Sequence, residues 1–367
     1  MMTQMRTHNS YIFKLFNFYI AAAAAAALLL AACSSDDDLK GYVPTAATID
    51  IVQNDLQFTA QGNTATVQVS TPVTATVDAP WCTATASGNT VTVTAEPNTS
   101  FEGRTALLTL TAGDVRRQLP VQQLGMVLGA MPVNNRYAPM SGDSFTFTLP
   151  HDLPMDVTTS VSWLHAQLDG DQLSITVDAN QEGHIRRGRV YTESAGFRDS
   201  LTIAQYDVHN DIAGSYYILG YYGGNSSQPA GTRFDLVERG DSLYMHWTTE
   251  SGRYNNRYVY VPFDRSTATL TLLSNFTLYE QGTTRDAGFF YDRDGHVCTS
   301  YSAGASCYMY YSEQSGYNAA LITPYNWPGH EIYGFLIRSM SLVTSNLIQL
   351  SNIVIMRVGP EGTTLGD

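Results

Sequence analysis

Residues 89–98 read NTVTVTAEPN, and residues 172–180 read QLSITVDAN. In both stretches apolar and polar residues alternate, and each stretch ends in an asparagine. Alternation with a period of two is typical of a half-buried β-strand, whose successive side chains point to opposite faces of a sheet. The same alternation at 65–69 and 108–111, with turn sequences such as Ser87-Gly88-Asn89 between the runs, predicts a series of short strands.

The two stretches belong to an internal repeat. It appears as four pairs of residues that lie 82 positions apart: Trp81 and Trp163, Asn98 and Asn180, Arg104 and Arg186, and Gln123 and Gln205. Four matches at one period indicate two tandem copies of one module, at 44–124 and 125–207. About seven short strands in such a length favour an Ig-like β-sandwich for each copy.

The repeated residues have structural explanations. A tryptophan at the start of a strand fills the core of a small sandwich. An asparagine at the end of a strand can bond the turn backbone, and an arginine shortly after it can hold the same turn. On this interpretation the two modules are spacers rather than ligand-binding domains.

The repeated pattern resembles the BACON domain, a Bacteroidetes-associated carbohydrate-binding module. The resemblance rests on the tryptophan, the strand that ends in asparagine, the arginine six or seven residues later and the final Val/Ile-x-Gln strand. It covers nearly half of the chain after Cys33, and the second copy is less regular from 184 to 189. The resemblance implies an Ig-like fold and a carbohydrate ligand.

The composition changes near Asp207. Of 23 tyrosines, 17 lie between 208 and 367. Alternating runs continue in this part, and turn sequences such as Asp294-Gly295 separate them. We expect eight or so antiparallel strands, which form a barrel or a sandwich. The opening at 212–217 loosely resembles the first strand of lipocalin-like barrels. The predicted fold class of the whole chain is therefore all-β.

The N-terminus has the features of an export signal. Positive charges at Arg6 and Lys14 precede an apolar run that ends in Leu30-Ala31-Ala32-Cys33, so residues 1–32 are a predicted signal peptide. The ending resembles the bacterial lipobox, which makes Cys33 the predicted lipidation site. A transmembrane helix is the alternative interpretation of the apolar run.

The residues after Cys33 indicate where the protein is exported. The acidic run 34–38 resembles the export signal of Bacteroidetes surface lipoproteins, and we expect a flexible acidic tether at 33–43. The predicted location is the outer membrane at the cell surface, and the alternative is a lipoprotein that faces the periplasm. Without Arg6 and Lys14 the chain has 18 basic and 33 acidic residues, which argues against nucleic acid as a partner.

No motif for catalysis or metal binding stands out. The sequence has no GxSxG, HExxH, P-loop or zinc-type Cys/His spacing, and its histidines are scattered singly. Asp292-Arg293-Asp294-Gly295 is predicted to be a turn rather than a calcium loop, because the later acidic ligand positions are missing. We therefore expect no metal, no cofactor and no enzymatic activity. Cys298 and Cys307 could form a disulfide in an exported protein.

Aromatic residues are the remaining candidates for ligand binding. Flat rings with a polar handle match the faces of sugars, although tyrosines also serve as cross-strand packing in β domains. The candidates are Tyr217, Tyr221, Tyr222, Tyr308, Tyr310, Tyr325 and Trp327. Tyr308 and Tyr310 should share one face of a strand.

Together these features predict a lipid-anchored surface protein that binds glycan through its C-terminal domain, with the repeats as a spacer. The alternative is a protein-binding adhesin or an accessory subunit of an outer-membrane complex. A glycan hydrolase is a third and weaker alternative, because paired carboxylates need only a suitable separation in space.

Overall fold

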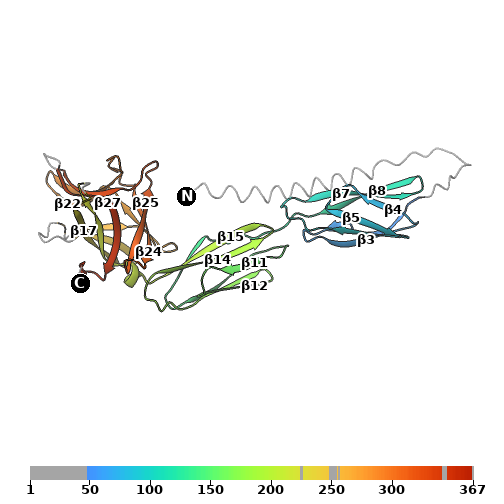
Figure 1. Cartoon of the computed structure of the whole chain (residues 1–367), viewed down its shortest axis with the longest axis horizontal. Helices are drawn as coiled ribbons and strands as arrows, with labels where there is room; N and C mark the ends of the chain where they lie inside the picture. The colour runs from blue at the N-terminus through green and yellow to red at the C-terminus, as the bar shows by residue number, and fades with distance from the viewer. Residues whose placement is uncertain (1–47, 224–225, 248–253, 255–256, 341–344, 366–367) are drawn as a thin grey trace, which may run out of the picture. The chain divides into compact units, whose positions relative to one another are not determined.

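The computed structural model describes residues 48–223, 226–247, 254, 257–340 and 345–365. The predicted signal peptide, the lipidation site Cys33 and the tether 33–43 lie outside the described residues. Within the described part, the one helix is a five-residue π-helix, η1 (Val208–Ile212), and strands make up the other regular structure. None of the described helical structure is long and apolar enough to cross a membrane. The predicted all-β class is confirmed (Figure 1).

The first module is a sandwich of two four-stranded sheets. Its first sheet has the order β1 (Ile51–Asn54), β3 (Asn63–Val69), β6 (Thr90–Ala95) and β5 (Cys82–Ser87). Its second sheet has the order β2 (Gln57–Phe58), β8 (Val115–Gln123), β7 (Arg104–Ala112) and β4 (Thr74–Val77). The strand predicted at 89–98 is the middle strand β6, and its inward residues Val91 and Val93 are fully buried. Burial of such alternating side chains between two sheets is what holds a sandwich together.

The second module repeats this arrangement. One sheet has the order β10 (Asp143–Thr148), β13 (Gln172–Val177) and β12 (Leu164–Asp169). The other has the order β11 (Asp156–Thr159), β14 (Arg186–Ser194), β15 (Phe197–Gln205) and β9 (Asn135–Ala138). In both modules the last long strand pairs in parallel with a short early strand, β8 with β2 and β15 with β9. Both modules are therefore Ig-like β-sandwiches, as predicted.

The C-terminal domain is one twelve-stranded sheet rather than the eight or so strands expected. Most of its pairings follow the order β19, β18, β17, β16, β27, β25, β24, β21, β20, and a branch of β26, β23 and β22 joins it at β27. The strand bounds are β16 (Gly214–Tyr222), β17 (Pro229–Arg239), β18 (Ser242–His246), β19 (Tyr258–Val261), β20 (Phe263–Asp264), β21 (Thr269–Leu273), β22 (Phe276–Gln281), β23 (Thr284–Tyr291), β24 (Gly304–Ser312), β25 (Tyr317–Tyr325), β26 (Gly334–Met340) and β27 (Ser345–Gly359).

Two features bend this sheet into a nearly closed barrel. First, β19 and β20 follow each other with only Pro262 between them, yet β19 pairs with β18 and β20 pairs with β21. Second, the long strand β27 pairs with β25 through its C-terminal half and with β26 through its N-terminal half. The two ends of the strand order, β19 and β20, are thus neighbours in the chain, which brings the outer edges of the sheet close together.

Aromatic side chains fill the interior of the barrel. The ring of Phe234 lies 5.3 Å from that of Tyr216 and 5.4 Å from that of Trp247, and Trp247 stacks on Phe335 at 5.7 Å. All four residues are buried. Because these rings occupy the interior, the surface residues and loops of this domain are the places to look for a ligand.

Candidate functional site

A tight turn after β23 holds the first two residues of the candidate site. The Asp292 carboxylate accepts a hydrogen bond from the backbone N–H of His296 at 2.8 Å, and the Asp292 N–H donates to the His296 carbonyl at 3.0 Å. Gly295 has a positive φ of 87°, a conformation that glycine adopts at little cost. The sequence Asp292–Gly295 is thus a turn, as predicted, and it places the His296 ring beside Asp292.

The pairing of β23 with β26 brings in the third residue. Tyr291 lies opposite Gly334 in the register, and the Tyr333 N–H donates to the Tyr291 carbonyl at 3.0 Å. This close approach needs a glycine, because a Cβ at Gly334 would lie 2.1 Å from the Tyr291 ring. His330, four residues before Gly334, consequently lies beside Asp292.

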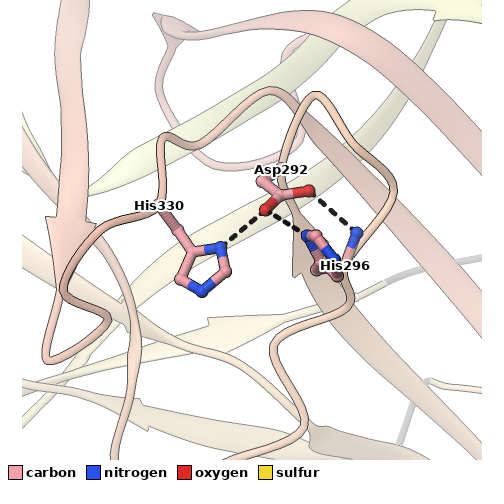
Figure 2. A group of neighbouring side chains, drawn as sticks. All are labelled: Asp292, His296 and His330. Atoms are coloured by element: carbon pink, nitrogen blue, oxygen red, sulfur yellow. Dashed lines mark hydrogen bonds and ion pairs between the residues drawn. The ribbon is translucent and has the colours of Figure 1, made fainter.

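Asp292, His296 and His330 form a compact cluster (Figure 2). The Nδ1 atoms of His296 and His330 lie 2.8 Å and 2.6 Å from the same carboxylate oxygen, Oδ2 of Asp292. The Asp292 side chain is 7% exposed, whereas that of His296 is 64% exposed and that of His330 is 30% exposed. A buried carboxylate therefore sits beneath two imidazoles that are open to solvent.

Hydrogen bonds determine the charge state of this cluster. Burial of Asp292 alone would raise its pKa, but the hydrogen bonds from His330 and His296 outweigh burial and hold the pKa well below its usual value. The side-chain hydrogen bond with Asp292, followed by the charge of that carboxylate, raises the pKa of His296. Asp292 is accordingly an anion at neutral pH, and the Nδ1 atoms of His296 and His330 both point at its carboxylate.

Trp327 extends the cluster into an aromatic surface. Its ring stacks on the His330 ring with centroids 4.3 Å apart and an interplanar angle of 12°. Asn326, with a positive φ of 48°, turns the chain after β25, and its Nδ2 donates to the Ser302 carbonyl at 3.0 Å. Tyr325, at the end of β25, is 38% exposed. Of the seven aromatic residues predicted to bind ligand, Trp327 is thus in contact with the Asp–His cluster and Tyr325 lies two residues from it in the chain.

The three predicted tyrosines of β16 lie on a different strand. Tyr217 accepts a hydrogen bond from the Leu365 N–H at 3.2 Å, so its hydroxyl already has a partner within the chain. Tyr221 is partly buried, and Tyr222 is exposed at the end of the strand. Tyr217 therefore fits the alternative interpretation, in which tyrosines pack between strands. Tyr222 is open to solvent.

Tyr308 and Tyr310 share the outer face of β24, because Cys307 and Met309 between and beside them are fully buried. The Arg187 guanidinium carbon lies 4.0 Å from the centroid of the Tyr308 ring, so that face of Tyr308 is covered. Tyr310 is exposed. The predicted shared strand face is confirmed, but only Tyr310 presents a free ring on it.

The disulfide that the sequence allowed between Cys298 and Cys307 is not formed in the structure. Both thiols are free and buried. The Cys298 N–H bonds the Phe290 carbonyl of β23, whereas Cys307 lies inside β24 opposite Leu270 and Ile322. Cys298 therefore lies in the segment between β23 and β24, which are not paired with each other, whereas Cys307 is part of β24.

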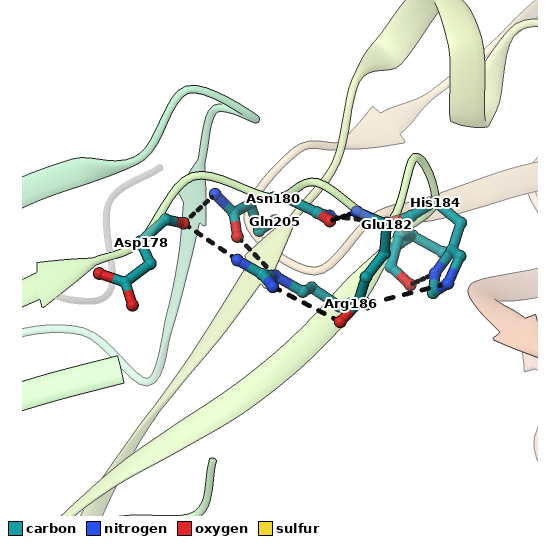
Figure 3. A network of polar contacts seen from close by, with 7 residues as sticks. Asp178, Asn180, Glu182, His184, Arg186 and Gln205 are labelled. Atoms are coloured by element: carbon teal, nitrogen blue, oxygen red, sulfur yellow. Dashed lines mark hydrogen bonds and ion pairs between the residues drawn. The ribbon is translucent and has the colours of Figure 1, made fainter. Parts of the chain in front are cut away.

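The repeated residues of the second module form a polar network (Figure 3). Arg186 Nε donates to Gln205 Oε1 at 2.8 Å, and both side chains donate to the Asp178 carbonyl, at 3.0 Å and 2.9 Å. Asn180 Nδ2 donates to the His184 carbonyl at 2.8 Å. The Arg186 guanidinium also lies 4.3 Å above the Trp163 ring. These residues fasten the turn before β14 to the end of β15.

The first module contains the same contacts. Arg104 Nε donates to Gln123 Oε1 at 2.8 Å, and both side chains donate to the Glu96 carbonyl at 2.9 Å. Asn98 bonds the turn backbone, and the Arg104 guanidinium lies 4.5 Å from the Trp81 ring. The structural interpretation of the repeated residues therefore holds in both modules, and neither tryptophan presents a free ring face toward that side.

Sequence reasoning missed the Asp292–His296–His330 cluster. The spacing of Asp292 and His296 within a predicted turn was an available signal, because a four-residue separation in a tight turn brings side chains together. His330 is 38 residues from Asp292 in the sequence, and nothing local indicates that the two meet. Their contact depends on how β23 pairs with β26.

Comparison with known proteins gives one family match. The family model for BACON, described as "Putative binding domain, N-terminal", matches residues 71–124, which contain β4 to β8 of the first module. No curated protein matches the chain.

Several solved structures share limited similarity with the chain. A Bacteroides ovatus GH5 xyloglucanase in complex with a XXXG heptasaccharide is 22% identical, with a TM-score of 0.21, over 24% of this chain and 22% of the xyloglucanase. The chain thus spans about a fifth of that enzyme's length. The I9–I11 tandem from titin is 8% identical, with a TM-score of 0.32, over 82% of this chain and 98% of the tandem. The endo-fucoidan hydrolase MfFcnA9 is 13% identical, with a TM-score of 0.22, over 41% of this chain and 32% of that one.

Proposed function

We propose that this chain is a lipid-anchored cell-surface protein that recognises glycan through its C-terminal barrel, with the two Ig-like modules as a spacer. The observation that carries the proposal is the surface around Trp327, where a partly exposed indole ring stacks on the partly exposed ring of His330 and an exposed Tyr325 lies two residues earlier in the chain. Apolar ring faces beside hydrogen-bonding groups match the alternating C–H and hydroxyl surfaces of a sugar. The BACON match in the first module supports a binding role for the protein.

The contacts of the repeated residues support the proposed spacer role. In each module the tryptophan is covered by an arginine, and the arginine, glutamine and asparagine bond backbone groups of their own module. The guanidinium thus covers one face of each tryptophan, and the polar groups of the arginine, glutamine and asparagine already have partners within the module. The tandem modules can therefore separate the barrel from an anchor at Cys33 without contributing a binding surface of this kind.

A glycan array probed with the whole chain tests the recognition step. We expect binding to at least one glycan class, and expect Trp327→Ala and Tyr325→Ala each to weaken it by about 2 kcal/mol, roughly 30-fold, as for central aromatic contacts. Tyr260→Ala is the matched control, because Tyr260 is an exposed tyrosine of β19 in the same domain. Binding that survives both substitutions would move the site away from this surface.

The anchor is tested separately. Metabolic labelling with a radioactive fatty acid should mark the wild-type chain and leave Cys33→Ser unlabelled, and protease added to intact cells should digest the wild type if it lies on the outer surface. A labelled chain that intact cells protect from protease would indicate the periplasm-facing alternative.

One observation favours the second candidate, a protein partner. Leu321 of β25 and Val354 of β27 are 59% and 54% exposed on neighbouring paired strands. Adjacent exposed apolar side chains on a sheet are typical of contact surfaces between proteins. Capture of a surface protein by the wild type but not by Leu321→Asp, with a silent glycan array, would favour this function.

A further inference from the structure

The Asp292–His296–His330 cluster contains more ligating groups than a structural contact needs. A carboxylate oxygen and one nitrogen from each histidine lie within 4.8 Å of one another. A single His–Asp hydrogen bond would be enough to join the turn after β23 to the loop before β26. Here two histidines from separate loops converge on one oxygen, Oδ2 of Asp292.

We infer that Asp292, His296 and His330 bind a divalent first-row transition metal ion of the Zn²⁺ type. Two imidazoles and one carboxylate are the donor set that such ions prefer, whereas Ca²⁺ takes six to eight oxygen ligands and Mg²⁺ keeps an octahedral oxygen shell. The structure offers one carboxylate and two nitrogen donors at this place, so the chemistry selects against the oxygen-binding ions.

The geometry needs only a small adjustment to accept the ion. Zinc lies about 2.0–2.1 Å from histidine nitrogen and about 2.0–2.2 Å from carboxylate oxygen, so tetrahedral ligand atoms are about 3.4 Å apart. The observed nitrogen–oxygen separations are 2.8 Å and 2.6 Å. An opening of about 0.6–0.8 Å is within reach of side-chain rotations, because the exposed ring of His296 has room to move.

The surroundings hold the ligands in place. The turn N–H of His296 bonds the second oxygen of Asp292 at 2.8 Å, which leaves Oδ2 directed at the histidines. Trp327 packs flat against the His330 ring and limits its rotation. Such supporting contacts orient metal ligands in known sites. With three protein ligands, the ion would keep an open position beside Trp327, as in zinc sites that bind water or substrate.

Calorimetric titration of the untagged full chain, freed of metal by chelation, tests the inference without any glycan. We expect saturable Zn²⁺ binding at one ion per chain and no comparable binding of Ca²⁺ or Mg²⁺. His296→Ala and His330→Ala should each weaken Zn²⁺ binding at least about tenfold. Since the His296 side chain is mostly exposed, its loss should leave the fold intact.

His165→Ala is the matched control. His165 also hydrogen-bonds an aspartate, Asp178, at 2.9 Å, and it is similarly exposed, but no second histidine joins the pair. Its substitution should leave the affinity unchanged. As a second measurement, Co²⁺ added to the wild type should give the visible absorption of a four-coordinate site, and His296→Ala should lose it.

Three outcomes would overturn the inference: no saturable Zn²⁺ binding, equal affinity in the His296→Ala, His330→Ala double variant, or tighter binding of Ca²⁺ than of Zn²⁺. None of them bears on glycan recognition, which the array measures independently. A silent array with intact Zn²⁺ binding would overturn the proposed function alone.

Discussion

Replacing Gln205 by alanine should destabilise the second module. The loss in the free energy of unfolding can be worked out from the contacts of the Gln205 side chain. The side chain is fully buried, accepts from Arg186 Nε at 2.8 Å and donates to the carbonyls of Pro139 and Asp178 at 2.8 Å and 2.9 Å. A neutral hydrogen bond contributes about 1 kcal/mol net, and one to a charged group about 2 kcal/mol. The sum predicts a loss of about 4 kcal/mol in the free energy of unfolding of this module.

Hydrogen exchange followed by mass spectrometry measures this loss locally. Amides of β14 and β15 that exchange through opening of the module should exchange roughly a thousandfold faster in Gln205→Ala, because 1.36 kcal/mol corresponds to a factor of ten. Peptides from β7 and β8 of the first module serve as an internal reference. The reciprocal change Gln123→Ala should accelerate those peptides, since Gln123 makes the same contacts.

Gln167→Ala is the control for the loss of a glutamine from this module. Gln167 is exposed on β12, where a substitution should change stability by no more than about 0.5 kcal/mol. If Gln205→Ala accelerates β14 and β15 less than about fivefold, or no more than Gln167→Ala does, the network would not be what stabilises the module. The structural explanation of the repeated residues would then fail.

Three further substitutions or measurements test other parts of the structure. Gly334→Ala should weaken the Zn²⁺ titration and lower stability by about 1–3 kcal/mol, because its Cβ would lie 2.1 Å from the Tyr291 ring, which the hydrogen bond from its hydroxyl to the Leu350 carbonyl holds in place. Burial raises the pKa of Cys307 to about 12, so iodoacetamide at pH 8 should label it in the unfolded chain but not in the native one, as mass spectrometry would show. Burial also raises the pKa of Asp211, so the folded state keeps a proton there that the unfolded state releases near pH 4; the stability of the wild type relative to Asp211→Asn should therefore fall as pH rises through this window, as the denaturation midpoints of the two chains would show.

The sequence predicted the sandwiches well because their signals are local. Alternation along a strand indicates which side chains face inward. The residue pairs at a fixed spacing of 82 positions identify the second copy of the module. The roles of Arg104 and Arg186 could also be anticipated, since each follows its turn by a few residues. The residues of such a turn are close neighbours in the chain, and a β-turn keeps them close in space.

The barrel and its site were less predictable because their contacts are not local. The strand count was too low in part because β23 is buried on both faces over most of its length and so shows no alternation, and because β20 has only two residues. The pairing of Tyr291 with Gly334 decides where His330 lies, and no sequence pattern indicates a strand register between residues 43 positions apart. Tyr308 was predicted to bind a ligand, but the Arg187 guanidinium covers its ring. Because Arg187 is distant from Tyr308 in the sequence, no local pattern indicated this contact.

The surroundings of each tryptophan indicate whether its ring has a structural role or could contact a ligand. Trp81 and Trp163 each lie under a guanidinium that is itself hydrogen-bonded to a buried glutamine, so exposing the covered face of either ring would break a satisfied network. Trp327 stacks on a single partly exposed histidine. A ligand that contacts the rest of this ring would not break a buried hydrogen bond of this kind. A ligand that displaces solvent at Trp327 therefore gains ring contact without dismantling the fold, whereas one at Trp81 or Trp163 would have to compensate for the lost network. This difference in cost is the physical reason to expect recognition at the barrel rather than in the repeated modules.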